Sequence, residues 1–401
     1  MSYYLGPHRT RWTPDTWRHV VDAAVAGTLD ETQWVELKAA LPAHSKPANL
    51  ELARDLASLA VDGGLLIIGI EDDKGRAGAV SGVELADLAD RVDQVARDRV
   101  HPPLVVRPVP IVDPTRPGRG CLLVTVDASP EAPHMVDERY WGRGATGKRP
   151  LIDADVRRLL ALNAQQREDF MQVVRQYVDA GPLAIPGSLH VLLTPRAGQH
   201  GALRDFLEEP FQLQQLVNEV CATDRTGWNL EALSQSRLTL RGLDISNVPL
   251  GDAVASSDFS QLHGKAVSLR DDGRVALTVT TLVFTETETG STKRWLSTKA
   301  VVALPRQTLR LAARLADYAG YGGQWDAAVV VTGLQGVKAH GDGHRFWAMG
   351  TAYPENEYLW STTTTTGELV DRPDDVLTRL LTPLLRVLGD QRQLDVQLGA
   401  T

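Results

Sequence analysis

The chain has 401 residues, of which 43% are hydrophobic and 23% charged; this is typical of soluble globular proteins and long enough for two domains. The net charge of −8 argues against electrostatic binding of nucleic acid by the whole surface, so nucleic-acid binding would need a local basic patch. Cys121 and Cys221 lie far apart, which favours free thiols in a cytoplasmic protein over a disulfide framework. No apolar run approaches the roughly 20 residues of a membrane span, so no membrane partner is expected.

Residues 1–165 predict a mixed α/β domain. Alternation predicts a strand over residues 34–39, with Val35 and Leu37 on one face and Glu36 and Lys38 on the other. A helix capped by Asn49 and an apolar strand follow, and Ser81 with Glu84 has the spacing of a capping box that opens another helix. The elements expected in chain order are helix 14–26, strand 34–39, helix 49–60, strand 65–70, helix 81–100, strands 104–109 and 121–127, and helix 153–166.

Residues 166–401 predict a second α+β domain, with a mainly antiparallel sheet flanked by helices. Strands are expected over residues 188–193, 237–243, 266–269, 275–285, 294–304, 327–332 and 345–351, and helices near 168–180, 203–220, 306–320 and 373–388. This domain is interpreted as a sensor, a surface for another protein or an oligomerisation module.

Acidic residues surround the strand–helix–strand unit of the first domain. Glu31 and Glu36 are five residues apart, which places them on opposite faces of a strand, or about 140° apart on a helix. They converge only if the chain turns between them, and residues 30–33 have the composition of a turn. Asp72 follows the strand over residues 65–70 and could join them. Carboxylates in such a cluster suit Mg²⁺ or Mn²⁺, and Lys38 could neutralise a phosphate oxygen.

The order of these parts resembles the Schlafen-type AlbA-like domain family over about residues 20–165. The pattern E-x-x-x-x-E-[FL]-K matches residues 31–38, and the glycine-rich strand pattern matches residues 63–75. The resemblance extends to Tyr140-Trp141-Gly142-Arg143-Gly144. It implies a divalent-metal-dependent nuclease acting on RNA, tRNA-like in kind, or on single-stranded DNA. The resemblance implies Glu31, Glu36 and Asp72 as the metal ligands and Lys38 as the contact to the scissile phosphate. It further implies a role in prokaryotic stress response or antiphage defence.

Basic residues near the end of this domain predict a contact with the nucleic-acid backbone. Glycine-rich backbone with arginines can clamp a sugar–phosphate chain. The residues expected to do so are Arg143, Lys148, Arg149 and Arg157. Family members with two such lobes imply that this single-lobed chain works as a homodimer or higher homo-oligomer.

Two other interpretations stay open. The first domain could bind nucleic acid without cutting it, as a transcriptional regulator or a defence scaffold. Alternatively, it could be a scaffold while residues 166–401 carry the function. The arrangement of the carboxylates separates the first interpretation from a nuclease: a metal site needs them to converge, whereas a binding domain does not.

Overall fold

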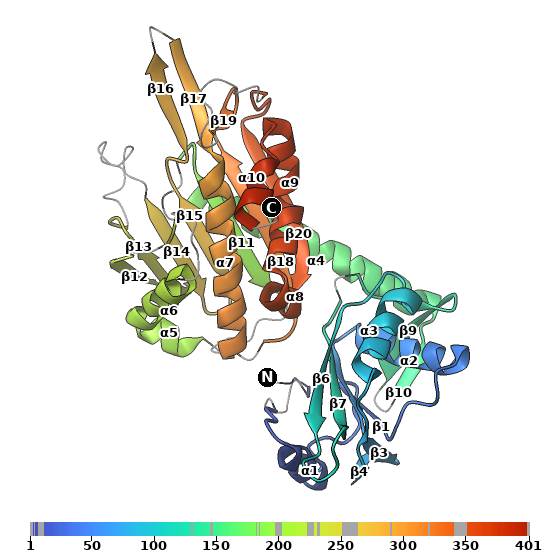
Figure 1. The fold of residues 1–401 in the computed structure, drawn as a ribbon. Coiled ribbons are helices and arrows are strands. Elements are labelled where there is room, and N and C mark those ends of the chain that lie inside the picture. Colours follow the sequence, from blue (N-terminus) through green and yellow to red (C-terminus); the bar gives the residue numbers. More distant parts are fainter. Residues whose placement is uncertain are drawn as a thin grey trace. The chain divides into compact units, whose positions relative to one another are not determined.

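The computed structural model (Figure 1) describes every residue except 1–2, 4, 7–11, 130, 145–146, 182, 184, 197–202, 223–227, 231–232, 251–263, 289–290, 320, 341–350 and 399–401. It divides into a first unit, Met1–Gln166 with Gly320–Gln324, and a second unit, Arg167–Ala319 with Trp325–Thr401. The long helix α4 (Asp153–Ala180) contributes residues to both. Among the described residues, no helix has the length and apolar character needed to cross a membrane.

The first unit is built on a five-stranded sheet. Strand β1 (Val35–Lys38) runs parallel to β2 (Gly64–Ile68), with Glu36 opposite Leu66 and Lys38 opposite Ile68. Strand β2 is antiparallel to β7 (Arg119–Val126), and β5 (Val83–Glu84) and β6 (Val106–Val112) also pair antiparallel with β7. Smaller sheets are β3 (Ile70–Asp73) with β4 (Arg76–Val80), and β8 (Met135–Val136), β9 (Arg139–Gly144) and β10 (Gly147–Pro150).

Two hydrophobic clusters cover the two faces of this sheet. Helices α2 (Lys46–Leu59) and α3 (Leu88–Arg99) pack on the face that presents Leu66 and Ile68. Helix α1 (Trp17–Val25) packs on the face that presents Val35 and Leu37. The expected alternation of β1 is therefore confirmed, and Glu36 and Lys38 lie on the α2 side of the sheet.

The starts of two helices differ from the sequence expectation. Ser45, not Asn49, caps α2, and its side chain accepts a hydrogen bond from the backbone N–H of Ala48. The capping-box prediction at Ser81 is wrong, because Val83 and Glu84 pair with β7 and α3 begins only at Leu88. Strand pairing with a distant segment overrode the local signal.

The second unit is built on a seven-stranded sheet in the order β12-β13-β14-β15-β11-β18-β20. These strands are β12 (Gln235–Thr239), β13 (Gly242–Ser246), β14 (Lys265–Arg270), β15 (Val275–Val279), β11 (Leu189–Pro195), β18 (Gln324–Thr332) and β20 (Glu357–Thr365). A three-stranded sheet holds β16 (Val283–Glu288), β17 (Ser291–Ser297) and β19 (Lys338–His340). The helices are α5 (Arg204–Glu208), α6 (Pro210–Ala222), α7 (Thr298–Ala319), α8 (Thr366–Asp371), α9 (Pro373–Leu388) and α10 (Arg392–Leu398). The α+β class expected of the chain is confirmed, with pairing that is largely antiparallel.

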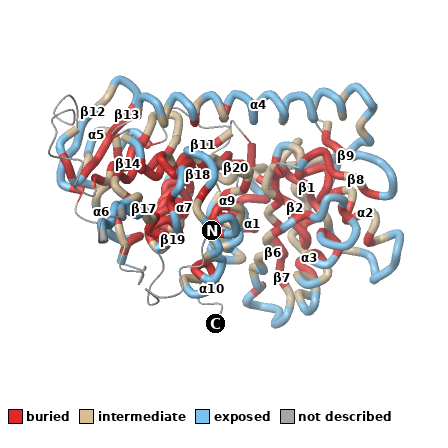
Figure 2. The backbone as a smooth tube through the Cα atoms, turned by 90° about the horizontal axis from the view of Figure 1, so that it is seen from above, coloured by how far each residue is buried: buried red, intermediate tan, exposed pale blue. Residues whose placement is uncertain are grey.

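The elements of the second unit differ from expectation at several places. The strand expected over residues 237–243 spans the turn between β12 and β13, and the helix expected over residues 203–220 is divided into α5 and α6. Helix α7 begins at Thr298, inside the strand expected over residues 294–304, and the strand expected over residues 275–285 is divided into β15 and β16. Most of the strand expected over residues 345–351 lies outside the described residues. In Figure 2 the central strands and α7 are largely buried, whereas much of α4 is exposed.

Candidate functional site

Glu36 lies on the side of the five-stranded sheet that α2 covers, and both of its carboxylate oxygens pair with cations. Its Oε1 accepts a hydrogen bond from Lys38 Nζ at 2.8 Å, and its Oε2 accepts one from Arg143 Nη1 at 2.7 Å. Lys38 follows Glu36 by two residues on the same strand, so the two side chains share a face. Arg143 comes from β9, and its side chain is only 1% exposed. The arginine also donates to the backbone carbonyl of Thr32.

Asp55 on α2 is the second acid of this cluster. Its carboxylate is completely buried and forms ion pairs with Lys148 and, at 3.2 Å, with Lys38. Lys148 also pairs with Glu51, one turn earlier on the helix, at 2.6 Å. Sequence reasoning did not single out Asp55. A signal was present, because Asp55 lies three residues after Leu52 and four before Leu59, within the apolar stripe that buries α2.

The cluster balances its charges internally. The carboxylates of Glu36, Asp55 and Glu51 face three cations, Lys38, Arg143 and Lys148. Burial raises the pKa of Glu36, but Lys38 and Arg143 outweigh it, so the net shift of this pKa is downward. Burial lowers the pKa of Lys38, and Asp55 and Glu36 more than reverse this. For Asp55 burial dominates, and the pKa is raised.

Glu31 and Asp72 each accept a hydrogen bond from a backbone N–H. Glu31 Oε1 accepts the N–H of Leu37 at 3.0 Å, and Asp72 Oδ1 accepts the N–H of Gly75 at 2.6 Å. The turn expected between Glu31 and Glu36 is present, closed by a bond from Thr32 N–H to the Val35 carbonyl. Burial raises the pKa of Glu31, and the nearby carboxylates of Glu36 and Asp72 add to that rise.

These carboxylates do not provide a ready ligand set for Mg²⁺ or Mn²⁺. Such ions take carboxylate oxygens that are free to coordinate, yet both oxygens of Glu36 already face cations. In the part of the chain that the structure describes, no group of three or more His, Cys, Asp or Glu side chains is arranged to hold a metal ion. Metal binding by Glu31, Glu36 and Asp72 stays a prediction.

The basic residues expected to bind nucleic acid separate into two pairs. Arg143 and Lys148 are cross-strand neighbours of β9 and β10 and point inward to Glu36 and Asp55. Arg149 lies on the opposite face of β10 and pairs with Asp155 at 2.8 Å, with 48% of its side chain exposed. Arg157 pairs with Asp153 at 2.8 Å on the surface of α4.

Three further side chains of β9 and α4 are also exposed. Arg139 and Tyr140 are exposed on β9, and Arg158 is exposed on α4. Within the described residues, Arg139 and Arg158 form no ion pair. We call Arg139, Tyr140, Arg149, Arg157 and Arg158 the basic rim.

Comparison with known proteins supports the domain assignment. Residues 31–152 match the family model described as Schlafen, AlbA_2, which suggests a nucleic-acid-binding or nuclease-like function. No curated protein matches the chain. A crystal structure of the DIP2311 protein from Corynebacterium diphtheriae is similar to 55% of this chain, with 19% identity and a TM-score of 0.26, and the aligned region covers 40% of that protein's chain.

Proposed function

We propose that the Schlafen AlbA_2 domain of this chain, at residues 31–152, holds the phosphate backbone of single-stranded nucleic acid without cutting it. The observation that carries the proposal is the pairing of Glu36 with both Lys38 and Arg143. A carboxylate that pairs with two cations of its own domain is poorly suited to bind a catalytic cation as well. The acidic cluster is then a structural link between β1, α2 and the β9–β10 hairpin.

The basic rim is the surface proposed to contact the nucleic acid. Arg139, Arg149, Arg157 and Arg158 can contact phosphates, and such contacts position a strand without reading its sequence. Tyr140, which is 37% exposed, offers an aromatic ring on which an unpaired base can stack. Because the chain carries a net charge of −8, binding depends on this local group of cations. RNA and single-stranded DNA are therefore the expected ligands.

The metal-dependent nuclease remains a second candidate, because Glu36 and Asp72 are near enough to Glu31 to raise its pKa. A nuclease would require these three acids to converge on one metal ion. A bound cation would have to displace Lys38 or Arg143 from Glu36. The candidate accordingly requires a rearrangement of the cluster that the binding function does not.

Fluorescence anisotropy tests the proposed function. Labelled single-stranded RNA and DNA are titrated with the full chain, once in EDTA and once with Mn²⁺. The proposal predicts equal affinity in both buffers and weaker binding by an Arg149→Gln, Arg157→Gln double variant. Binding that requires Mn²⁺, or that the double variant leaves unchanged, would contradict it.

A further inference from the structure

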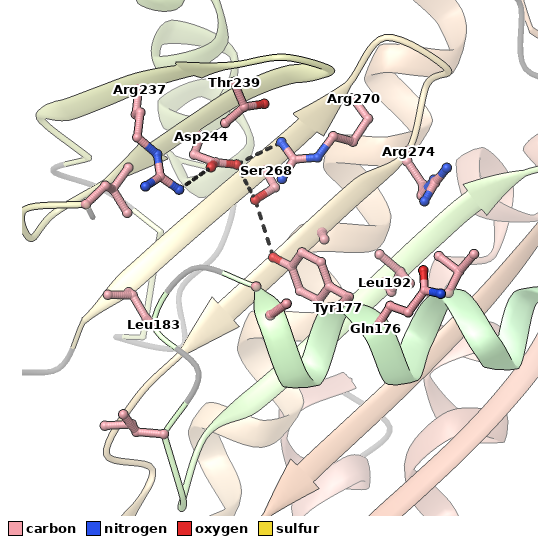
Figure 3. A pocket seen from close by; sticks show the side chains of 16 residues that line it. Gln176, Tyr177, Leu183, Leu192, Arg237, Thr239, Asp244, Ser268, Arg270 and Arg274 are labelled. Atoms are coloured by element: carbon pink, nitrogen blue, oxygen red, sulfur yellow. Dashed lines mark hydrogen bonds and ion pairs between the residues drawn. The ribbon is translucent and has the colours of Figure 1, made fainter. Parts of the chain in front are cut away.

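The second unit contains a cavity of about 680 Å³ between the end of α4 and the face of the seven-stranded sheet (Figure 3). Its size is in the range of pockets that hold small organic ligands, roughly 300–1,000 Å³. All of its lining residues belong to the second unit. The basic rim and the acidic cluster do not contribute to it.

The cavity lies where the face of the seven-stranded sheet changes from apolar to polar side chains. Leu192, Ala276 and Ala328 are neighbours across three strands, and they pack under Phe170 and Val174 of α4. The same row continues through β14, β13 and β12 as Ser268, Asp244 and Arg237. The apolar part of the row is covered by the helix, whereas the polar part lines the open cavity beyond it.

Arginines dominate the charge of this cavity. Arg237, Arg270 and Arg274 line it, and Asp244 is the only lining carboxylate among the described residues. The side chains of Arg237, Arg270 and Arg274 are 42%, 23% and 30% exposed, so solvent and small solutes can reach these arginines. Arg274 pairs with Asp272 at the adjacent turn. The lining therefore has a positive excess that a bound anion would balance.

Asp244 holds two of these arginines in place. Its side chain is only 1% exposed, with Oδ1 2.8 Å from Arg270 Nη1 and Oδ2 3.2 Å from Arg237 Nη2. Ser268 Oγ donates to the same carboxylate at 2.7 Å. A guanidinium has five N–H donors, so each arginine keeps donors beyond those that Asp244 accepts. The buried acid orients the arginines and leaves them able to bind a second anion.

Hydrogen bonds continue from Ser268 into the core. Tyr177 Oη donates to Ser268 Oγ at 3.4 Å and accepts from Thr278 Oγ1 at 3.3 Å. Thr278 Oγ1 in turn lies 3.1 Å from His190 Nδ1. Burial raises the pKa of Tyr177, which keeps its hydroxyl protonated as a donor. This chain of side chains fixes the floor of the cavity before any ligand arrives.

We propose that this cavity binds a small phosphorylated molecule of nucleotide size. The phosphate would be held by Arg237, Arg270 and Arg274, since planar guanidinium groups can each donate two parallel hydrogen bonds to phosphate oxygens. The remainder of the ligand would lie against Leu183, Leu192 and Leu250, which form apolar parts of the wall. The inference concerns the second unit and is independent of the function proposed for the first.

Isothermal titration calorimetry of the full chain tests this proposal with AMP, ATP, inorganic pyrophosphate and citrate as probes. We expect AMP and ATP to bind, and an Arg270→Gln variant to weaken them about tenfold, because a charge-assisted hydrogen bond is lost. Arg314→Gln is the matched control, since Arg314 is a surface arginine of the same unit, paired with Glu219 at 3.4 Å and not among the lining residues. It should bind as the unchanged chain does.

A second variant covers the case in which Arg270→Gln fails to fold because Asp244 loses a partner. Arg274→Gln removes a lining arginine whose partner, Asp272, is 24% exposed, so its loss leaves no buried charge. It should also bind about tenfold more weakly. Absence of binding by AMP and ATP, or equal binding by Arg274→Gln and Arg314→Gln, would overturn the proposal. Citrate or pyrophosphate binding as tightly as the nucleotides would overturn the ligand class.

Discussion

Glu36 Oε2 lies 2.7 Å from Arg143 Nη1, which joins residues 107 positions apart in the sequence. The two belong to the first and last parts of the Schlafen AlbA_2 match, at β1 and at β9. The same guanidinium also donates to the backbone carbonyls of Thr32 and Val35, which lie on the two sides of the turn that precedes β1. Glu36, which was predicted to bind a metal, and Arg143, which was predicted to bind nucleic acid, therefore form an ion pair with each other.

Replacement of Arg143 should destabilise the first unit. In Arg143→Gln the carboxylate of Glu36, which is only 9% exposed, keeps Lys38 but loses its other cation. Leaving a buried charge underpaired typically costs about 3 kcal/mol of unfolding free energy. Hydrogen exchange of amides in β1 and α2 of the full chain measures this loss locally.

The matched control is Arg149→Gln on the neighbouring strand. Its side chain is 48% exposed, and surface ion pairs such as the one that it forms with Asp155 contribute at most about 1 kcal/mol. Equal protection in the two variants would mean that the bond between Glu36 and Arg143 does not support the fold.

The same hydrogen exchange should depend on pH. The folded-state pKa of Glu36 is lowered by Lys38 and Arg143, which outweigh the effect of its burial, and a hydrogen bond from Lys148 lowers that of Glu51. A carboxyl with a depressed folded pKa stabilises the fold above its unfolded pKa, about 4.3 for glutamate, and this stabilisation is lost as pH falls through the folded value. Protection of β1 should therefore decrease in this acid range, after correction for the intrinsic exchange rate.

Glu36→Gln isolates the part of this dependence that belongs to Glu36. The raised pKa of Asp55 acts with the opposite sign, since a group that holds its proton more tightly in the fold favours the folded state at low pH. The variant should show a shallower acid loss than the unchanged chain. An identical pH profile would contradict the assignment of this loss to Glu36.

Nucleic-acid affinity should fall with salt in proportion to the cations of the basic rim. For single strands, each phosphate contact contributes about 0.7 to the slope of log K against log salt. Arg149→Gln and Arg157→Gln should each reduce the slope by about this amount, as measured by anisotropy over a series of KCl concentrations.

Arg18→Gln serves as the comparison for this series. Arg18 is 87% exposed on α1, the helix on the other face of the central sheet, and it also has an acidic partner, Asp22. A reduced slope in this variant, equal to that of Arg149→Gln, would show that the basic rim is not the binding surface.

The strand–helix–strand unit and the resemblance of this region to the Schlafen AlbA-like domain could be predicted from the sequence, and both are confirmed, the second by the family match at residues 31–152. These features rest on local patterns: alternation in β1, the apolar stripe of α2 and the glycines that follow it. The partners of Glu36 were not predictable in the same way. Lys38 shares its strand and was placed correctly, but the contact with Arg143 depends on how β9 packs, which no local pattern encodes.

The burial of Asp55 and the start of α7 likewise depend on contacts with segments that are distant in the sequence. An aspartate in an apolar stripe is normally unfavourable, and only the two lysines brought to it by β1 and β10 make its burial tolerable. Helix α7 begins at Thr298, inside the strand expected over residues 294–304, and it packs against α9 and β11, which are distant in the sequence.

The decisive measurement is cleavage of tRNA and single-stranded DNA by the purified chain with Mn²⁺ or Mg²⁺, beside the Glu36→Gln variant. We expect both proteins to bind the nucleic acids and neither to cut them. Metal-dependent cleavage by the unchanged chain, lost in Glu36→Gln, would contradict this expectation and would establish the acidic cluster as a nuclease site.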